Sequence, residues 1–190
     1  MNDDQRQVVL GTLLGNGYIC KGKKNHYLCM RHSVHHLDWL KSKAMELGDL
    51  ASANPWYEYE TTWTWRSRCD SIFVELRKLY YPKDVKEVSM DWLDSLRDIA
   101  IAVWYGDSGC LAGRNSKNAC LRTQSFGFKG NKIIETYFNE VGFPCSMNKS
   151  RNSFVIVFSV HSTRKFLTMV APYLTKKKLA DLLPPYLAVV

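Results

Sequence analysis

Two stretches of the chain share one pattern and end in similar glycine turns. The first reads Leu13-Leu14-Gly15-Asn16-Gly17, and the second reads Trp104-Tyr105-Gly106-Asp107-Ser108-Gly109. Gly17 and Gly109 lie 92 positions apart, and at the same offset His32-Ser33 falls on Gln124-Ser125 and Leu28-Cys29 on Cys120-Leu121. Further along, Phe73 corresponds to Phe166 and Tyr80 to Tyr173. A pattern that recurs in this way predicts two similar halves of about 95 residues, 1–86 and 87–190.

Each half is predicted to run helix, strand, strand, helix, strand, strand, helix. The ranges expected in the first half are 3–15, 18–22, 26–32, 37–47, 56–59, 62–68 and 70–80. Those expected in the second are 89–106, 110–113, 118–124, 133–141, 146–148, 154–160 and 162–174. Alternating apolar residues indicate the strands, and apolar residues three and four apart indicate the helices. The prediction is an α+β fold of two pseudo-symmetric αββαββα halves, whose antiparallel strands form a saddle with one face free of helices.

The composition narrows the class of protein. Twenty-six Lys and Arg against 18 Asp and Glu give a formal net charge of +8, while 46% of residues are hydrophobic. A basic, packable domain favours a polyanionic partner, and nucleic acid is the first candidate.

The sequence also suggests where the protein works. It has no apolar run of 18 residues, and it begins with acidic, polar residues that do not suit a secretory signal. We therefore expect an intracellular protein, in the cytoplasm, nucleoid or an organelle matrix, and not a secreted one. The six cysteines form no Cys-x-x-Cys motif, and the expectation is that they stay reduced.

The glycines at the two helix ends suggest where a site would form. Glycine in the last turn of a helix lets two helix backbones approach closely. If the helices cross there, positions 16 and 108 meet at the centre of the molecule. Acidic residues at such a point would hold divalent cations, which can activate water and stabilise the leaving oxygen of a phosphodiester.

With these two helix ends, the sequence resembles the LAGLIDADG homing endonucleases of the single-chain, intron-encoded type. Further motifs carry the resemblance along the chain: Tyr80-Tyr81-Pro82, Leu121-Arg122-Thr123-Gln124-Ser125-Phe126, and His32-Ser33 followed by His36 and Trp39-Leu40. The resemblance implies a monomeric, magnesium-dependent, site-specific endonuclease that binds double-stranded DNA, with Ca²⁺ or Mn²⁺ as substitute ions. The rival hypothesis is a catalytically silent nucleic-acid binder, either a maturase-like protein for intron RNA or a DNA-binding relic.

The chain departs from the family pattern at its centre. The resemblance places the metal site at Gly15, Asn16, Asp107 and Ser108, where the family has aspartate at the positions of Asn16 and Ser108. Three explanations are open: deliberate substitution that blocks cleavage, natural loss of cleavage with binding kept, or a local shift that recruits Asp107 as a ligand. The third requires reshaping of the last helical turn, since each residue turns the helix by about 100°.

Four more residues are catalytic candidates by the same resemblance. His32 and Gln124 match the position that orders waters around the metals, against the alternative of exposed polar residues at strand ends. Lys86 and Lys177 match basic residues near the scissile phosphates, against the alternative of solvated surface lysines.

Polar residues of the strand pairs are the candidates for DNA contact. Arg and Lys can contact guanine edges or phosphates, and Asn can contact adenine. The predicted DNA-binding residues are Lys21, Lys23, Lys24, His26, Arg66, Arg68, Arg114, Asn115, Lys117, Asn118 and Arg122.

Overall fold

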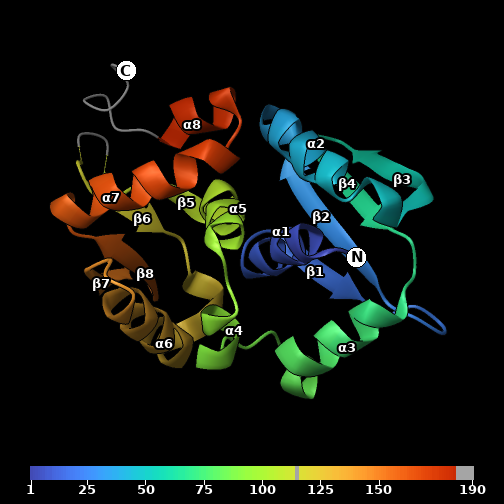
Figure 1. The fold of residues 1–190 in the computed structure, drawn as a ribbon, viewed down its shortest axis with the longest axis horizontal. Coiled ribbons are helices and arrows are strands. Elements are labelled where there is room, and N and C mark those ends of the chain that lie inside the picture. Colours follow the sequence, from blue (N-terminus) through green and yellow to red (C-terminus); the bar gives the residue numbers. More distant parts are fainter. Residues whose placement is uncertain (114–115, 183–190) are drawn as a thin grey trace.

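The computed structural model describes residues 1–113 and 116–182, and it shows two halves of the same topology (Figure 1). The first half contains α1 (Asp3–Leu14), β1 (Gly17–Cys20), β2 (Tyr27–Ser33), α2 (Leu37–Glu46), β3 (Ala51–Tyr59), β4 (Thr62–Ser67) and α3 (Ser71–Tyr80). The second contains α4 (Met90–Asp94), α5 (Asp98–Ser108), β5 (Gly109–Leu111), β6 (Ala119–Leu121), α6 (Gly127–Glu140), β7 (Cys145–Ser150), β8 (Ser153–Phe158), α7 (Val160–Val170) and α8 (Lys176–Leu182). Short 3₁₀ helices η1 (Val34–His36) and η4 (Gln124–Phe126) follow β2 and β6.

The two sheets confirm the predicted architecture. Their strand orders are β1-β2-β4-β3 and β5-β6-β8-β7, and every pairing is antiparallel. The fold is therefore α+β, with the repeated helix and strand order that the sequence predicts.

Several predicted elements have other bounds in the structure: β3 begins at Ala51 instead of 56, α6 begins at Gly127 instead of 133, and α7 ends at Val170 instead of 174. Two further differences lie closer to the centre of the molecule. The helix expected over 89–106 is two helices, because Ser95 Oγ donates to the carbonyl of Trp92 and the Arg97 N–H donates to Gln7 Oε1 at 2.7 Å. The strand expected over 118–124 stops at Leu121, and Gln124 opens η4 instead. The break between α4 and α5 comes from contacts that a helix pattern does not contain.

The register of the sheets corrects the predicted correspondence by one residue. Gly17 pairs with Met30, whereas Gly109 pairs with Leu121, so the second hairpin is one residue shorter. Counting from these pairs, His32 corresponds to Thr123. The predicted equivalence of His32 and Gln124 is therefore wrong.

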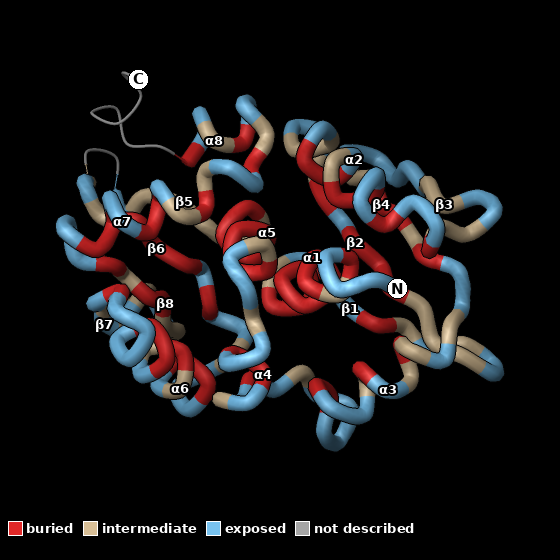
Figure 2. The backbone as a smooth tube through the Cα atoms, viewed as in Figure 1, coloured by how far each residue is buried: buried red, intermediate tan, exposed pale blue. Residues whose placement is uncertain are grey.

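Helices α1 and α5 lie side by side at the centre of the molecule, and most of their residues are buried (Figures 1 and 2). A Cβ added at Gly11 would lie 2.2 Å from the Ala100 carbonyl oxygen. A Cβ added at Gly15 would lie 2.4 Å from Cβ of Asp107. The glycines thus allow the close approach that the sequence predicts.

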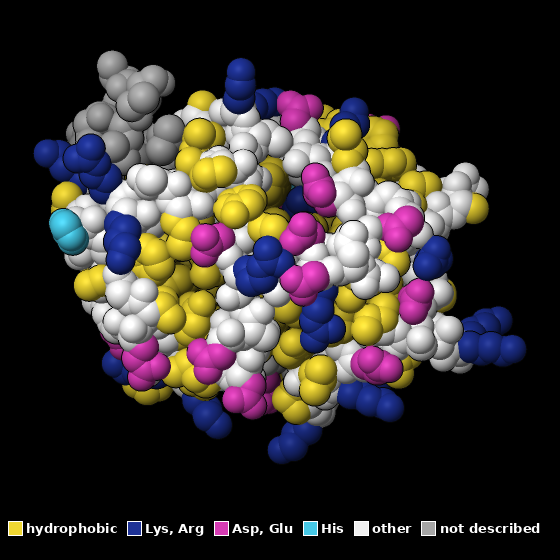
Figure 3. Space-filling model, in the orientation of Figure 1, with side chains coloured by type: hydrophobic (Ala, Val, Ile, Leu, Met, Phe, Trp, Pro, Cys, Tyr) yellow, Lys and Arg dark blue, Asp and Glu magenta, His cyan; other side chains and the backbone are white. Residues whose placement is uncertain are grey.

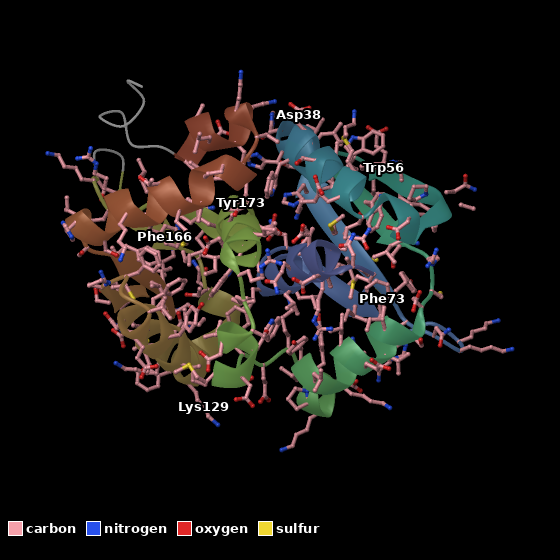
Figure 4. All side chains as sticks on the ribbon, viewed as in Figure 1. Asp38, Trp56, Phe73, Lys129, Phe166 and Tyr173 are labelled. Carbon is pink, nitrogen blue, oxygen red and sulfur yellow. The ribbon has the colours of Figure 1, made fainter. Side chains whose placement is uncertain are left out.

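The closing helices of the two halves pack in the same way. Phe73 on α3 and Phe166 on α7 are both fully buried, each within its own half (Figure 4). Within the strands, successive side chains point to opposite faces of the sheet. Met30 and Trp65 pair across β2 and β4 on the buried face, while the next pair, Arg31 and Thr64, points to the opposite face.

In each half, the strand side chains on this opposite face, such as Arg31 and Thr64 in the first half, point outward from the sheet. We call these two outward faces, one in each half, the open faces. Among the described residues, no helix combines the length and the apolarity needed to cross a bilayer.

Candidate nucleic-acid interface and its central turns

The ends of α1 and α5 meet in a hydrogen-bonded contact. The backbone N–H of Asn16 donates to Oδ2 of Asp107 at 3.0 Å, and the Asn16 amide Nδ2 donates to the Asp107 carbonyl at 3.2 Å. Ser108 follows directly as the last residue of α5. Positions 16 and 108 therefore belong to adjoining turns, as the sequence predicts.

Asp107 is the most heavily bonded carboxylate of the centre. Its side chain is 0% exposed, and Nζ of Lys43 contacts both of its oxygens, at 2.6 and 2.8 Å. Trp39 Nε1 donates to Oδ1 at 2.7 Å, and His32 Nε2 lies 3.2 Å from the same oxygen. Burial alone would raise the pKa of Asp107, but the Lys43 ammonium and the His32 contact outweigh burial and lower it. Asp107 therefore stays ionised, with both oxygens already engaged.

The structure separates the two residues expected to order water. The His32 side chain is 2% exposed, contacts Lys43 Nζ at 3.1 Å, and has its pKa lowered chiefly by burial. Gln124 is exposed on η4, where its carbonyl accepts a hydrogen bond from Ser153. His32 thus belongs to the buried cluster around Asp107.

Lys86 lies beneath the turn that carries Asn16. Its Nζ donates to the carbonyls of Leu13 and Gly17 at 2.5 and 2.8 Å, so a positive charge caps the C-terminal end of α1. Burial lowers the pKa of Lys86 to about 8. Lys177 is exposed on α8 and pairs with Asp38 of α2 at 3.1 Å.

The donor set of these turns does not fit a divalent metal. Asn16 and Ser108 offer neutral oxygens, and the one carboxylate beside them is neutralised by Lys43. Hard cations require several oxygen ligands, usually with carboxylates among them. Among the residues that the structure describes, no group of three or more His, Cys, Asp or Glu could hold a metal ion.

Candidate DNA-contacting residues of the first half surround one hairpin and its neighbouring strand. Lys23 and Lys24 are exposed in the loop that joins β1 to β2. Lys21 pairs with Asp84 at 2.6 Å, and His26 forms an isolated bridge with Asp70. Lys23 and Lys24 thus place positive charge at the outer end of the hairpin.

The arginines of β4 differ in position. Arg66 lies on the open face, with its guanidinium 4.2 Å from the ring centre of Tyr57. Arg68 follows the strand and donates to the Asp49 carbonyl at 2.7 Å. Arg66 therefore projects from the sheet, while Arg68 is tied to the loop before β3.

In the second half the candidates are again close to the first hairpin. Arg122 is exposed one residue beyond β6, and its predicted location on the open face follows from the alternation of the strand. Asn118 donates to the Phe158 carbonyl at 2.6 Å, and Lys117 is exposed beside it. Arg114 and Asn115 lie outside the described residues.

Sequence reasoning missed two residues of this region. Lys43 stands four residues after Trp39 on the apolar side of α2, next to Ala44, and a lysine at such a helical spacing signals a buried ion pair. Arg31 shares the open face with Cys29, as strict alternation along β2 indicates. Its Nε donates to Thr64 Oγ1 at 3.2 Å.

Charge is mixed on the face of the molecule that carries the start of α1. Figure 3 shows acidic and basic side chains side by side in the middle of this face. Here Arg97 contacts Asp3 and, at 3.1 Å, Asp4. This face lacks the uniform positive charge that a polyanion would require, so the open faces of the sheets are the better candidates.

The fold and the central turns define a known class. Residues 6–166 match the model of the LAGLIDADG DNA endonuclease family, and the chain belongs to this family.

Among curated proteins, the chain is 25% identical over 204 residues to Protein RecA of Mycolicibacterium flavescens, which covers 98% of this chain and 48% of that protein. It is 30% identical over 83 residues to probable intron-encoded DNA endonuclease 3 of Mycosarcoma maydis, covering 43% of this chain and 60% of that protein. The chain thus spans about half the length of the first of these relatives.

Solved structures share the fold over nearly the whole chain. The homing endonuclease I-WcaI, bound to its DNA recognition sequence, matches with a TM-score of 0.85 and 21% identity, covering 96% of this chain and 87% of that one. I-DmoI in complex with DNA and Mn matches with a TM-score of 0.55 and 14% identity, covering 88% and 96%. I-DmoI has also been crystallised with DNA and Ca.

Proposed function

We propose that this chain binds double-stranded DNA across the open faces of its two sheets and does not cleave it through a metal centre. The observation that supports the proposal is the charge and the bonding of the side chains in the central turns. Asn16 and Ser108 are neutral, and Asp107 is closed off by Lys43, Trp39 and His32.

The arrangement of cations supports DNA as the partner. Arg31, Arg66 and Arg122 occupy the open faces or their edges, and exposed lysines extend from the first hairpin. The major groove of DNA admits a two-stranded ribbon, and arginine can contact both guanine edges and phosphates. The DNA complex of I-WcaI, with which this chain shares its fold, supports the same mode of binding.

The magnesium expected from the family resemblance is the part of the prediction that the donor set argues against. The Asp107 charge is matched by the buried Lys43 ammonium, so these two residues add no net negative charge. A cation at this point would have to displace Lys43 or bind to neutral oxygens alone. We therefore assign no step of catalysis to a metal here.

We also infer that the protein acts as a monomer, because one chain already supplies both sheets and both central turns. A monomer with two different halves suits a DNA site that is not a palindrome. Intron RNA is the alternative partner, and it enters the experiment as a competitor.

The test is selection from a library of random DNA duplexes, with and without Mg²⁺. The expected result is retention of a common sequence with no cut products, and binding that weakens steeply as salt increases. Cut products from the wild-type chain would overturn the assignment of a silent centre. A structured RNA that displaces the selected duplex at equal concentration would overturn DNA as the partner.

The double variant N16D/S108D tests the centre itself. Cleavage by the variant, with none by the wild-type protein, would show that the two neutral residues are what blocks catalysis. The matched control is N152D, which adds a carboxylate in the exposed turn between β7 and β8. Cleavage by this control would contradict the assignment of the centre to positions 16 and 108.

A further inference from the structure

Each half carries a pair of cysteines across its first two strands. In the first half, Sγ of Cys20 on β1 lies 3.5 Å from Sγ of Cys29 on β2. In the second half, Cys110 of β5 stands directly opposite Cys120 of β6. The two pairs therefore occupy the same hairpin of the repeated unit.

The pairs lie on the open faces. Cys29 is in register with Tyr18 on one side and with Arg66 on the other, and side chains in register share a face. Cys110 is in register with Cys120, and Arg122 follows Cys120 by two residues, a spacing that places both side chains on one face. Each thiol pair thus adjoins an arginine that we assign to DNA contact.

Within each pair the two sulfurs differ in exposure and in acidity. Cys20 and Cys110 are partly exposed, whereas Cys29 and Cys120 are buried. The hydrogen bond from Cys29 is the main cause that lowers the pKa of Cys20 to about 6. The pKa of each buried partner is raised. An exposed thiolate beside a thiol is the arrangement found in redox-sensing cysteines.

We propose that these two pairs are redox-active dithiols, which close to disulfides in the presence of a peroxide and thereby strengthen DNA binding. The thiolate of Cys20 or Cys110 attacks a peroxide oxygen, hydroxide leaves, and the sulfur becomes a sulfenic acid. The thiol of Cys29 or Cys120 then attacks that sulfur, and water leaves as the S–S bond forms. Two electrons from each pair reduce one peroxide. A disulfide needs the sulfurs to approach from 3.5 Å to about 2.05 Å in the first half.

The effect on DNA follows from charge and rests on the proposed function. In the reduced protein, a negatively charged thiolate partly neutralises the adjacent guanidinium group of Arg66 or Arg122. The disulfide carries no charge, so both guanidinium groups become available for phosphates. Two additional phosphate contacts would steepen the slope of log affinity against log salt by up to about 1.8.

The experiment uses the full chain with C69S and C145S, which leaves the two pairs and removes the cysteines outside the hairpins. The protein is treated with hydrogen peroxide and mapped by mass spectrometry of non-reduced peptides. Affinity is then measured by fluorescence anisotropy with a labelled duplex of random sequence. We expect Cys20–Cys29 and Cys110–Cys120 bonds, a several-fold tighter complex with a steeper salt slope, and full reversal by dithiothreitol.

The controls separate the two parts of the proposal. Adding C20S and C110S should remove both the bonds and the gain in affinity. Absence of the two bonds in the peptide map would overturn the proposal, as would bonds that leave affinity within twofold. A reduced protein that binds no duplex would contradict the proposed function instead, because bond formation is decided by the peptide map alone.

Discussion

Replacing Lys43 with methionine should destabilise the protein severely, because it leaves Asp107 as a buried charge without a cation. The two side chains are 1% and 0% exposed, and both Asp107 oxygens accept from the ammonium. Removing one partner of such a pair costs about 3–5 kcal/mol. In a chain of 190 residues this corresponds to a Tm lower by roughly 6–20 °C.

Urea denaturation at pH 7 measures the loss, and the dependence on pH tests its cause. In the wild-type protein the pKa of Asp107 is lowered, so its contribution is complete above its unfolded value of about 3.9 and is lost as the pH falls. In K43M burial dominates and raises the pKa of Asp107, so the destabilisation should shrink as the pH falls from 7 to 4. The double variant K43M/D107N should be more stable than K43M.

Lys177→Met is the matched control. Lys177 also pairs with an aspartate across the two halves, but both side chains of the pair are 61% exposed. Such pairs contribute at most about 1 kcal/mol, so K177M should unfold near the wild-type midpoint. A K43M variant that loses less than 1 kcal/mol, with the same loss at every pH, would refute the buried ion pair.

Three further outcomes are expected. Gly11→Ala should cost about 1–3 kcal/mol in urea denaturation, because the new Cβ would lie 2.2 Å from the Ala100 carbonyl oxygen; Gly48→Ala, with nothing within 4 Å, should not. In the protein whose two cysteine pairs are oxidised, Arg66→Ala and Arg122→Ala should each reduce the salt slope of DNA binding by about 1, while Arg97→Ala should leave it unchanged, because Arg97 contacts Asp3 and Asp4. Burial lowers the pKa of Lys86 from 10.5 to about 8, so between pH 8 and 10.5 the unfolded state binds more protons than the folded state, and the free energy of unfolding should rise with pH. This rise should be weaker in Lys86→Met. An equal dependence of stability on pH in the two proteins would contradict the prediction.

Most of the fold can be predicted from the sequence, because each helix and strand leaves a local periodic pattern of apolar residues. Apolar spacing identifies α1, α2 and α6, and alternation identifies β2 and β4. The break between α4 and α5 escapes such patterns, since Gln7, far away in sequence, bonds both the Ser95 carbonyl and the Arg97 N–H. A contact between residues that are far apart in the sequence leaves no periodic pattern in it.

The candidate site was predictable in part. The paired glycine turns identify positions 16 and 108 as neighbours, and the structure joins them through Asp107. The cysteine pairs were not predictable, because register depends on the length of the hairpin loop. The second hairpin is one residue shorter, which sets Cys110 opposite Cys120 whereas Cys20 lies diagonally from Cys29.

Among the residues that the structure describes, the side chains bonded to the Asp107 carboxylate all come from the other half of the chain. Lys43 and Trp39 lie on α2 and His32 on β2, while Asp107 lies in the last turn of α5. A hybrid protein that joins residues 87–190 to the first half of a relative would inherit this carboxylate without its partners. Such a hybrid must therefore also contain the lysine, tryptophan and histidine that contact Asp107, or it must replace Asp107 with an uncharged residue. Exchange of halves without further substitution is restricted to relatives that keep all four residues.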